Sequence, residues 1–224
     1  MQAVHVWDVL VRIFHWALVV AVLLSFYTLK TDGAPFLFPI EIHAQAGYVV
    51  LGLLTFRWIW AFFGTHYARF RAFLTSPKTS ASYAQSLIRR QPTPYAGHNP
   101  LGGWAVLILM LSLTFQAVSG LFLSDDIFFS GPLYGSLGNA FSNALVSWHA
   151  LNAQFLMVLI GLHLVAIAVH AALGERLVKA MFTGVKTFTQ TPADAINVSI
   201  RLPIISALVA ILAGTGMSVF FWLQ

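Results

Sequence analysis

Four histidines lie within or at the ends of long apolar stretches of the chain: His15, His43, His149 and His163. An ionisable side chain in a bilayer is costly and usually marks a functional site. Neutral imidazole is a good ligand for transition metals, iron among them. Two strong axial imidazoles leave no open position on a haem iron, and such a centre transfers electrons rather than activating oxygen. The four histidines therefore indicate two bis-histidine haem sites for single-electron transfer.

The composition is that of an integral membrane protein. Of the 224 residues, 58% are hydrophobic and only 8% are charged, whereas a soluble domain carries about 25% charged residues. The chain contains no cysteine, which excludes covalently attached haem c, iron–sulfur clusters, Cys-type zinc sites and disulfides. The net charge of +5 comes from basic residues that cluster in two loops, as the positive-inside rule predicts. We therefore expect membrane lipids, and no nucleic acid, as partners.

Five segments are long and apolar enough to cross a bilayer, which requires about 20 residues. They are approximately residues 9–29, 43–63, 101–123, 148–173 and 203–223. The fifth contains Gly214 and Gly216 and no titratable residue, which indicates a packing helix. The expected fold is an all-α integral membrane protein: a four-helix transmembrane bundle that holds two haems, followed by a fifth transmembrane helix.

The charges of the loops assign each helix end to one side of the membrane. Basic residues predominate in residues 64–100 and 174–202, whereas residues 124–147 carry Asp125 and Asp126 and no base. Basic loops face the cytoplasm. The pattern predicts a multi-pass protein of the bacterial cytoplasmic membrane with a cytoplasmic N-terminus and a periplasmic C-terminus. The two acids either dock a basic partner or are simply solvated.

This topology sorts the four histidines into two layers. His43 and His149 lie at the outer ends of the second and fourth helices, and His15 and His163 lie nearer the inner side. Fourteen residues separate His149 from His163, which is a rise of about 21 Å at nearly the same helical angle. We expect the pairs His43 with His149 and His15 with His163. For any one histidine the alternative is an interhelical hydrogen bond worth about 1 kcal/mol.

Three further residues are candidates for contact with the haems. Gly47 lies one turn below His43, where the missing side chain would leave room for a macrocycle; close helix packing is the alternative. Arg12 lies one turn before His15, and Arg57 follows His43 by fourteen residues on nearly the same face. Either guanidinium would pair with a haem propionate, and Arg57 would otherwise snorkel to the interface.

Two other histidines lie near the predicted inner side. His170 is near the inner end of the fourth helix. We expect it either to be a polar residue at the end of this helix or to lie next to a quinone. His98 lies in the loop before the third helix. Together with Arg12 and Arg57, both would supply hydrogen bonds or protons there, which slightly favours the inner side for a quinone.

Four stretches resemble the bacterial cytochrome b561 family, which includes the cytochrome b subunit of nickel–iron hydrogenases. They are residues 7–16 (WDVLVRIFHW), residues 95–104 (YAGHNPLGGW), residues 120–126 (GLFLSDD) and the segment from Trp148-His149 to Leu162-His163. The resemblance covers about residues 5–175. It implies a di-haem cytochrome b core over residues 1–175, with two haem b groups and the four histidines as axial ligands. Residues 176–224 would form a cytoplasmic connector and the additional fifth helix.

The resemblance also implies a function in single-electron transfer between a quinone pool and a partner redox protein. The main alternative is a membrane anchor subunit of a hydrogenase or another dehydrogenase. Related stand-alone proteins accept electrons from superoxide or exchange them with c-type cytochromes, which would make the chain a quinone-linked oxidoreductase. A metal or proton transporter would place acidic residues at mid-membrane. None of the seven acidic residues lies inside a predicted helix core, which disfavours that alternative.

Overall fold

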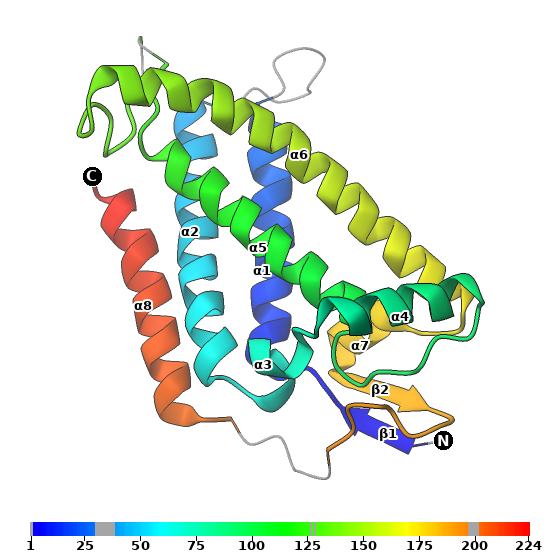
Figure 1. Ribbon diagram of the computed structural model, residues 1–224. Coiled ribbons are helices and arrows are strands. Elements are labelled where there is room, and N and C mark those ends of the chain that lie inside the picture. The colour runs from blue at the N-terminus through cyan, green and yellow to red at the C-terminus, as the bar shows by residue number, and fades with distance from the viewer. Residues whose placement is uncertain (1, 30–38, 126, 128, 197–201) are drawn as a thin grey trace. The chain divides into compact units, whose positions relative to one another are not determined.

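The computed structural model describes residues 2–29, 39–125, 127, 129–196 and 202–224. Its elements, in chain order, are β1 (Gln2–His5), α1 (Val9–Thr28), α2 (Ile40–Phe63), the short 3₁₀ turn η1 (His66–Ala68), α3 (Phe70–Phe73), α4 (Pro77–Ile88), α5 (Pro100–Gly120), α6 (Asn139–Ala172), α7 (Leu177–Thr183), β2 (Val185–Phe188) and α8 (Ile204–Trp222) (Figure 1).

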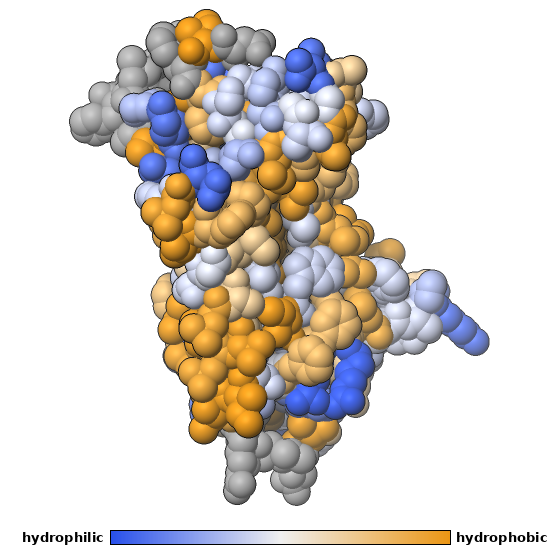
Figure 2. Space-filling view, turned by 90° about the vertical axis from the view of Figure 1, so that its left-hand side faces the viewer, coloured by the Kyte–Doolittle hydropathy of each residue, from blue (hydrophilic) through white to orange (hydrophobic). Residues whose placement is uncertain are grey.

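Five helices of the described residues, α1, α2, α5, α6 and α8, are long and apolar enough to cross a membrane. They confirm the five predicted spans. Their surfaces suit lipid, because large apolar side chains such as Val158 and Leu162 on α6 and Leu212 on α8 are exposed. Figure 2 shows broad hydrophobic areas, in orange, on the face in view. Lipid offers no hydrogen-bonding partners to backbone N–H and C=O groups, whereas a helix pairs these groups internally.

The fourth span differs from its prediction at one end. Helix α6 has 34 residues and begins at Asn139 rather than near residue 148. Gly138 precedes it with φ of 91°, a left-handed conformation that suits glycine and stops a helix from extending backwards. Residues 139–147 are mixed in polarity, so hydropathy alone does not detect this first part of the helix.

The chain forms two compact units. The first comprises Met1–Ile13, Trp58–Leu109 and Leu159–Leu208, and the second comprises Phe14–Arg57, Met110–Val158 and Val209–Gln224. Each of the five long helices is divided between the two units, with one segment in each.

In the first unit, the buried carboxylate of Asp8 joins the start of α1 to the end of α2. Its Oδ1 accepts the backbone N–H of Val11 at 2.9 Å, as an N-cap does. Its Oδ2 accepts hydrogen bonds from Trp60 Nε1 at 3.1 Å and Thr65 Oγ1 at 2.6 Å. Three donors therefore compensate the burial of this carboxylate.

The first unit also contains a small antiparallel sheet that the sequence did not predict. Strand β1 pairs with β2 from Gln2↔Phe188 to His5↔Val185. Strands of four residues carry too short an alternation to be recognised. The sheet attaches the N-terminal segment to the chain that follows α7.

Two charged side chains hold the loop before α5 in the first unit. The Asp194 carboxylate accepts the backbone N–H groups of Ala96 at 2.6 Å and Gly97 at 2.8 Å. Lys186 Nζ donates to the carbonyl oxygens of Tyr95 and Gly97 at 3.3 and 3.1 Å, and burial lowers the pKa of this ammonium group. Side chains thus form hydrogen bonds with both N–H and carbonyl groups of the loop backbone.

In the second unit, α8 packs against α2 through two glycines. A Cβ atom on Gly52 would overlap the carbonyl oxygen of Gly214, and one on Gly214 would lie 2.6 Å from the carbonyl oxygen of Gly52. Ser218 Oγ donates to the carbonyl oxygen of Tyr48 at 3.0 Å. Gly214 therefore provides the close packing expected of the fifth span, whereas Gly216 is exposed and a Cβ there would contact no atom within 4 Å.

Candidate functional site

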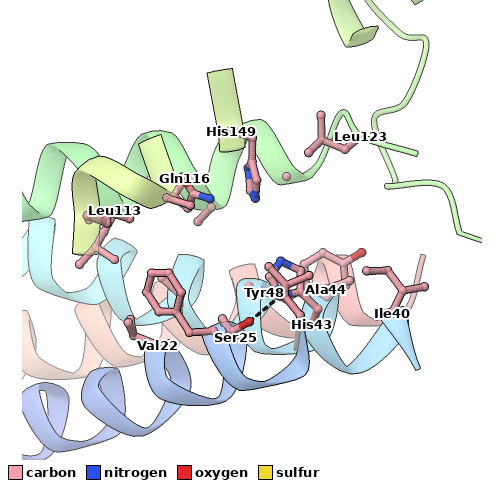
Figure 3. Close-up of a pocket in the computed structure, with 18 of the residues that line it drawn as sticks. Val22, Ser25, Ile40, His43, Ala44, Tyr48, Leu113, Gln116, Leu123 and His149 are labelled. Carbon is pink, nitrogen blue, oxygen red and sulfur yellow. Dashed lines mark hydrogen bonds between the residues drawn. The ribbon is translucent and has the colours of Figure 1, made fainter. Parts of the chain in front are cut away.

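The second unit encloses a cavity of about 250 Å³ lined by residues of α1, α2, α5, α6 and the segment that follows α5. Its walls are mainly apolar, with a few polar groups, as in most cofactor sites. His43 from α2 and His149 from α6 face each other across it (Figure 3). The other lining residues include Val22, Ser25, Phe26, Ala44, Gly47, Tyr48, Val50, Leu113, Gln116, Gly120, Leu123, Asp125, Phe129 and Leu156.

The distance between the two imidazoles fits a single metal atom between them. Their ring centroids are 6.4 Å apart, and the ring planes are inclined at 74°. A bond from a metal to an imidazole nitrogen is about 2 Å, so two imidazoles on one metal have ring centroids about 6 Å apart. His43 and His149, the pair predicted for the outer layer, therefore have the spacing of two axial ligands of one iron atom.

Hydrogen bonds on the opposite side of each ring assign its tautomer. His43 Nδ1 lies 2.9 Å from the carbonyl oxygen of Ser25, which only accepts, so this nitrogen carries the proton. Ser119 Oγ lies 2.9 Å from His149 Nδ1 and donates its own proton to the carbonyl oxygen of Gln116 at 3.1 Å. His149 Nδ1 is therefore a donor as well. Both Nε2 atoms keep a lone pair for a metal, and each Nδ1 donates to an oxygen, as is usual for histidines that bind metals.

Gly47 lines the cavity, and a Cβ atom built on it would contact no atom within 4 Å. Gly47 therefore does not serve close helix packing, which was the alternative interpretation of this glycine. The open space is compatible with a macrocycle next to α2.

Replacing Gly47 with leucine should prevent cofactor binding without harming the fold. A Cβ atom at this position would contact no atom within 4 Å, and Gly47 lines the cavity, so a leucine side chain would take up volume that the macrocycle needs. We expect at least a tenfold lower haem content at the outer site, measured by absorbance of the purified protein. Gly216→Leu, on the exposed face of α8, is the matched control; equal haem content in both variants would contradict the assignment.

The other two histidines belong to different units, because His15 lies in the second unit and His163 in the first. Both are half-buried on their helices. The ring of His15 packs edge-on against Trp16, with centroids 5.1 Å apart. Their pairing with each other stays a prediction.

The two candidate arginines lie in different environments. Arg12, in the first unit, donates a hydrogen bond to the carbonyl oxygen of Phe182 near the end of α7, a partner that the sequence did not indicate. Arg57, in the second unit, is only 3% exposed, so its side chain does not snorkel to an interface. A pairing of either guanidinium with a haem propionate stays a prediction.

The ring of His98 packs against aromatic side chains. In the first unit its ring lies between Trp7 and Phe73, with centroids 4.7 Å from each. This aromatic packing explains why a loop histidine is not simply solvated.

His170, in the last turn of α6, has polar partners near both ring nitrogens. Its Nδ1 lies 3.3 Å from Glu175 Oε1, and its Nε2 lies 3.2 Å from Asn99 Nδ2. Burial raises the pKa of Glu175, but the hydrogen bond from His170 and the charges of His170 and Lys186 outweigh burial and hold this pKa below its usual value. His170 is thus a polar residue at the end of α6, which is one of the two roles that the sequence indicated. Its partners were missed because neither is within one helical turn of it.

The carboxylate of Asp125 organises the acidic loop that follows α5. Its Oδ1 accepts the backbone N–H groups of Ile127 at 3.0 Å and Phe129 at 2.7 Å, an Asx-type turn. Asp125 also lines the cavity, and Asp126 lies outside the described residues. The carboxylate of Asp125 therefore shapes the loop at the cavity, and its docking role stays a prediction.

Comparison with known proteins identifies the family of the chain. The model of the family described as prokaryotic cytochrome b561 matches residues 6–184. A probable Ni/Fe-hydrogenase B-type cytochrome subunit of Azotobacter vinelandii is 28% identical over 86% of this chain and 92% of its own length. The protein of the same description from Cupriavidus necator is 26% identical over 84% and 88%, respectively. No solved structure matches significantly. The match over most of the chain shows that this protein belongs to the prokaryotic cytochrome b561 family and is a membrane b-type cytochrome.

Proposed function

We propose that the protein is a di-haem cytochrome b that passes single electrons across the membrane. The observation that carries the proposal is the outer pair of opposed imidazoles, with ring centroids 6.4 Å apart across an apolar cavity. The second haem would lie between His15 and His163. Support for it comes from the fourteen-residue spacing of His149 and His163 on the continuous helix α6, which turns both side chains to nearly the same face.

The residues of the outer site hold and tune a haem rather than react themselves. The bound haem would supply one-electron iron chemistry, and two imidazole ligands would exclude oxygen and substrates from the iron. Ser25 and Ser119 orient the imidazoles and increase their basicity as ligands. The walls of the cavity are mainly apolar and offer water few hydrogen-bonding partners.

The orientation proposed for the chain is a cytoplasmic N-terminus and a periplasmic C-terminus in the bacterial inner membrane. It rests on the positive-inside rule and on the basic residues of the segments around α3, α4 and α7. In this orientation the pair His43 and His149 lies in the outer layer.

The proposed partners are a hydrogenase on the outer side and a quinone. The names of the relatives carry the first of these, because they describe B-type cytochrome subunits of Ni/Fe-hydrogenases. A c-type cytochrome or superoxide as partner has no comparable support. Electrons from hydrogen oxidation would enter at the outer haem and leave to a membrane quinone.

A haem count together with a reduced-minus-oxidised spectrum of the purified protein tests the proposal. We expect two b-type haems per chain, both reducible by a quinol and reoxidised by a quinone. One haem per chain would overturn the di-haem assignment. A colourless protein that unfolds cooperatively would overturn the proposal as a whole.

A further inference from the structure

A polar network lies in the membrane-spanning part of the second unit, beside the outer cavity. Ser112 Oγ donates to Asn152 Oδ1 at 2.8 Å. Asn152 Nδ2 donates to the carbonyl oxygen of Ser112 at 3.0 Å and to Gln116 Oε1 at 2.6 Å. Ser112 and Gln116 are four residues apart and share one face of α5. The network therefore joins α5 to α6 one turn from His149.

These hydrogen bonds determine which way the amide of Gln116 points. Asn152 has only one possible orientation, because an exchange of its oxygen and nitrogen would place Oδ1 against the carbonyl oxygen of Ser112, which only accepts. Gln116 Oε1 is therefore an acceptor, and Gln116 Nε2 with its two N–H donors lies on the other side of the amide. Gln116 lines the cavity, and Figure 3 shows its nitrogen on the side of His149.

We propose that Gln116 presents its amide N–H groups to the haem of the outer site and raises the reduction potential of that haem, and that Asn152 is a positioning residue that acts through Gln116. The inference rests on the proposed haem between His43 and His149. Beside His43 and His149, which would ligate this haem, Gln116 would then be a residue that adjusts its reduction potential.

The physical reason is electrostatic. Reduction adds one electron to the haem, and the positive end of a nearby amide dipole stabilises the reduced form relative to the oxidised form. The effect is larger in an apolar cavity than in water, because the effective dielectric constant is lower. A polar group in a membrane is also costly, so an amide that served only to join two helices would gain nothing by facing a cavity.

Potentiometric titration of the two haems in the full-length protein tests the proposal. In Gln116→Leu and Gln116→Met we expect two haems per chain, with the potential of one shifted to a more negative value and the other unchanged. Asn152→Leu should shift the same haem in the same direction by a smaller amount. In the double variant Gln116→Leu/Asn152→Leu the shift should equal that of Gln116→Leu alone, because Asn152 then has no amide to orient.

Thr215→Val is the control, since Thr215 lies on the exposed face of α8 and its hydroxyl donates to the carbonyl oxygens of Ile211 and Leu212 in its own helix. Unchanged potentials in both Gln116 variants would overturn the inference, and so would additive shifts in the double variant. Unchanged potentials with a raised KM for quinol would also overturn it, by assigning the N–H donors to a quinone carbonyl. Loss of the outer haem in both variants would make Gln116 a structural residue instead. A wild-type protein without haem would be a failure of the proposed function, which is a distinct result.

Discussion

His149→Leu should purify with one haem per chain instead of two. The substitution removes one of the two imidazoles that face each other across the outer cavity and leaves His43 without an opposing ligand. Loss of an outer-shell partner alone costs about 10–100-fold in metal affinity, so loss of the ligand itself should lower the affinity of this site for haem by at least about 100-fold. The haem count and the amplitude of the difference spectrum measure the effect.

The variant should still fold, because leucine suits a cavity with mainly apolar walls. His5→Leu is the matched control, since His5 is exposed on β1 in the first unit and should retain both haems. Two haems with unchanged spectra in His149→Leu would show that the assignment of the outer pair is wrong.

Gly52→Val should weaken the attachment of α8 and destabilise the second unit. The new side chain would overlap the carbonyl oxygen of Gly214 and Ser218 Oγ, so the two helices would have to separate. Overpacking costs about 1–3 kcal/mol and more where backbone must move, and we expect the upper part of this range. The midpoint temperature of unfolding in detergent should fall clearly.

The same substitution should also lower occupancy of the outer haem site. Tyr48 lines the cavity, accepts a hydrogen bond from Ser218 and packs against Phe221 at 6.2 Å between ring centroids. Gly216→Val, on the exposed face of α8, is the control and should behave as the unchanged protein. An unfolding temperature in Gly52→Val equal to that of this control would contradict the role of the glycine contact.

The sequence by itself determined the spans and the family. Lipid cannot satisfy backbone hydrogen bonds, so a span must be a continuous apolar helix that hydropathy detects. This local signal found α1, α2, α5, α6 and α8, although α6 begins nine residues earlier and α5 ends three residues earlier than predicted. It also singled out His43 and His149, because an ionisable residue is conspicuous in an apolar segment.

Only the tertiary structure decided how the candidate site is built. The partners of its imidazoles are the Ser25 carbonyl and the Ser119 hydroxyl, and hydropathy has no signal for either. The orientation of Gln116 depends on Asn152, thirty-six residues away on another helix. Gly52 and Gly214 are neighbours only because α2 and α8 meet. Each of these contacts joins residues far apart in the chain, so none follows from a local pattern; each depends on which helix faces meet, and at what distance.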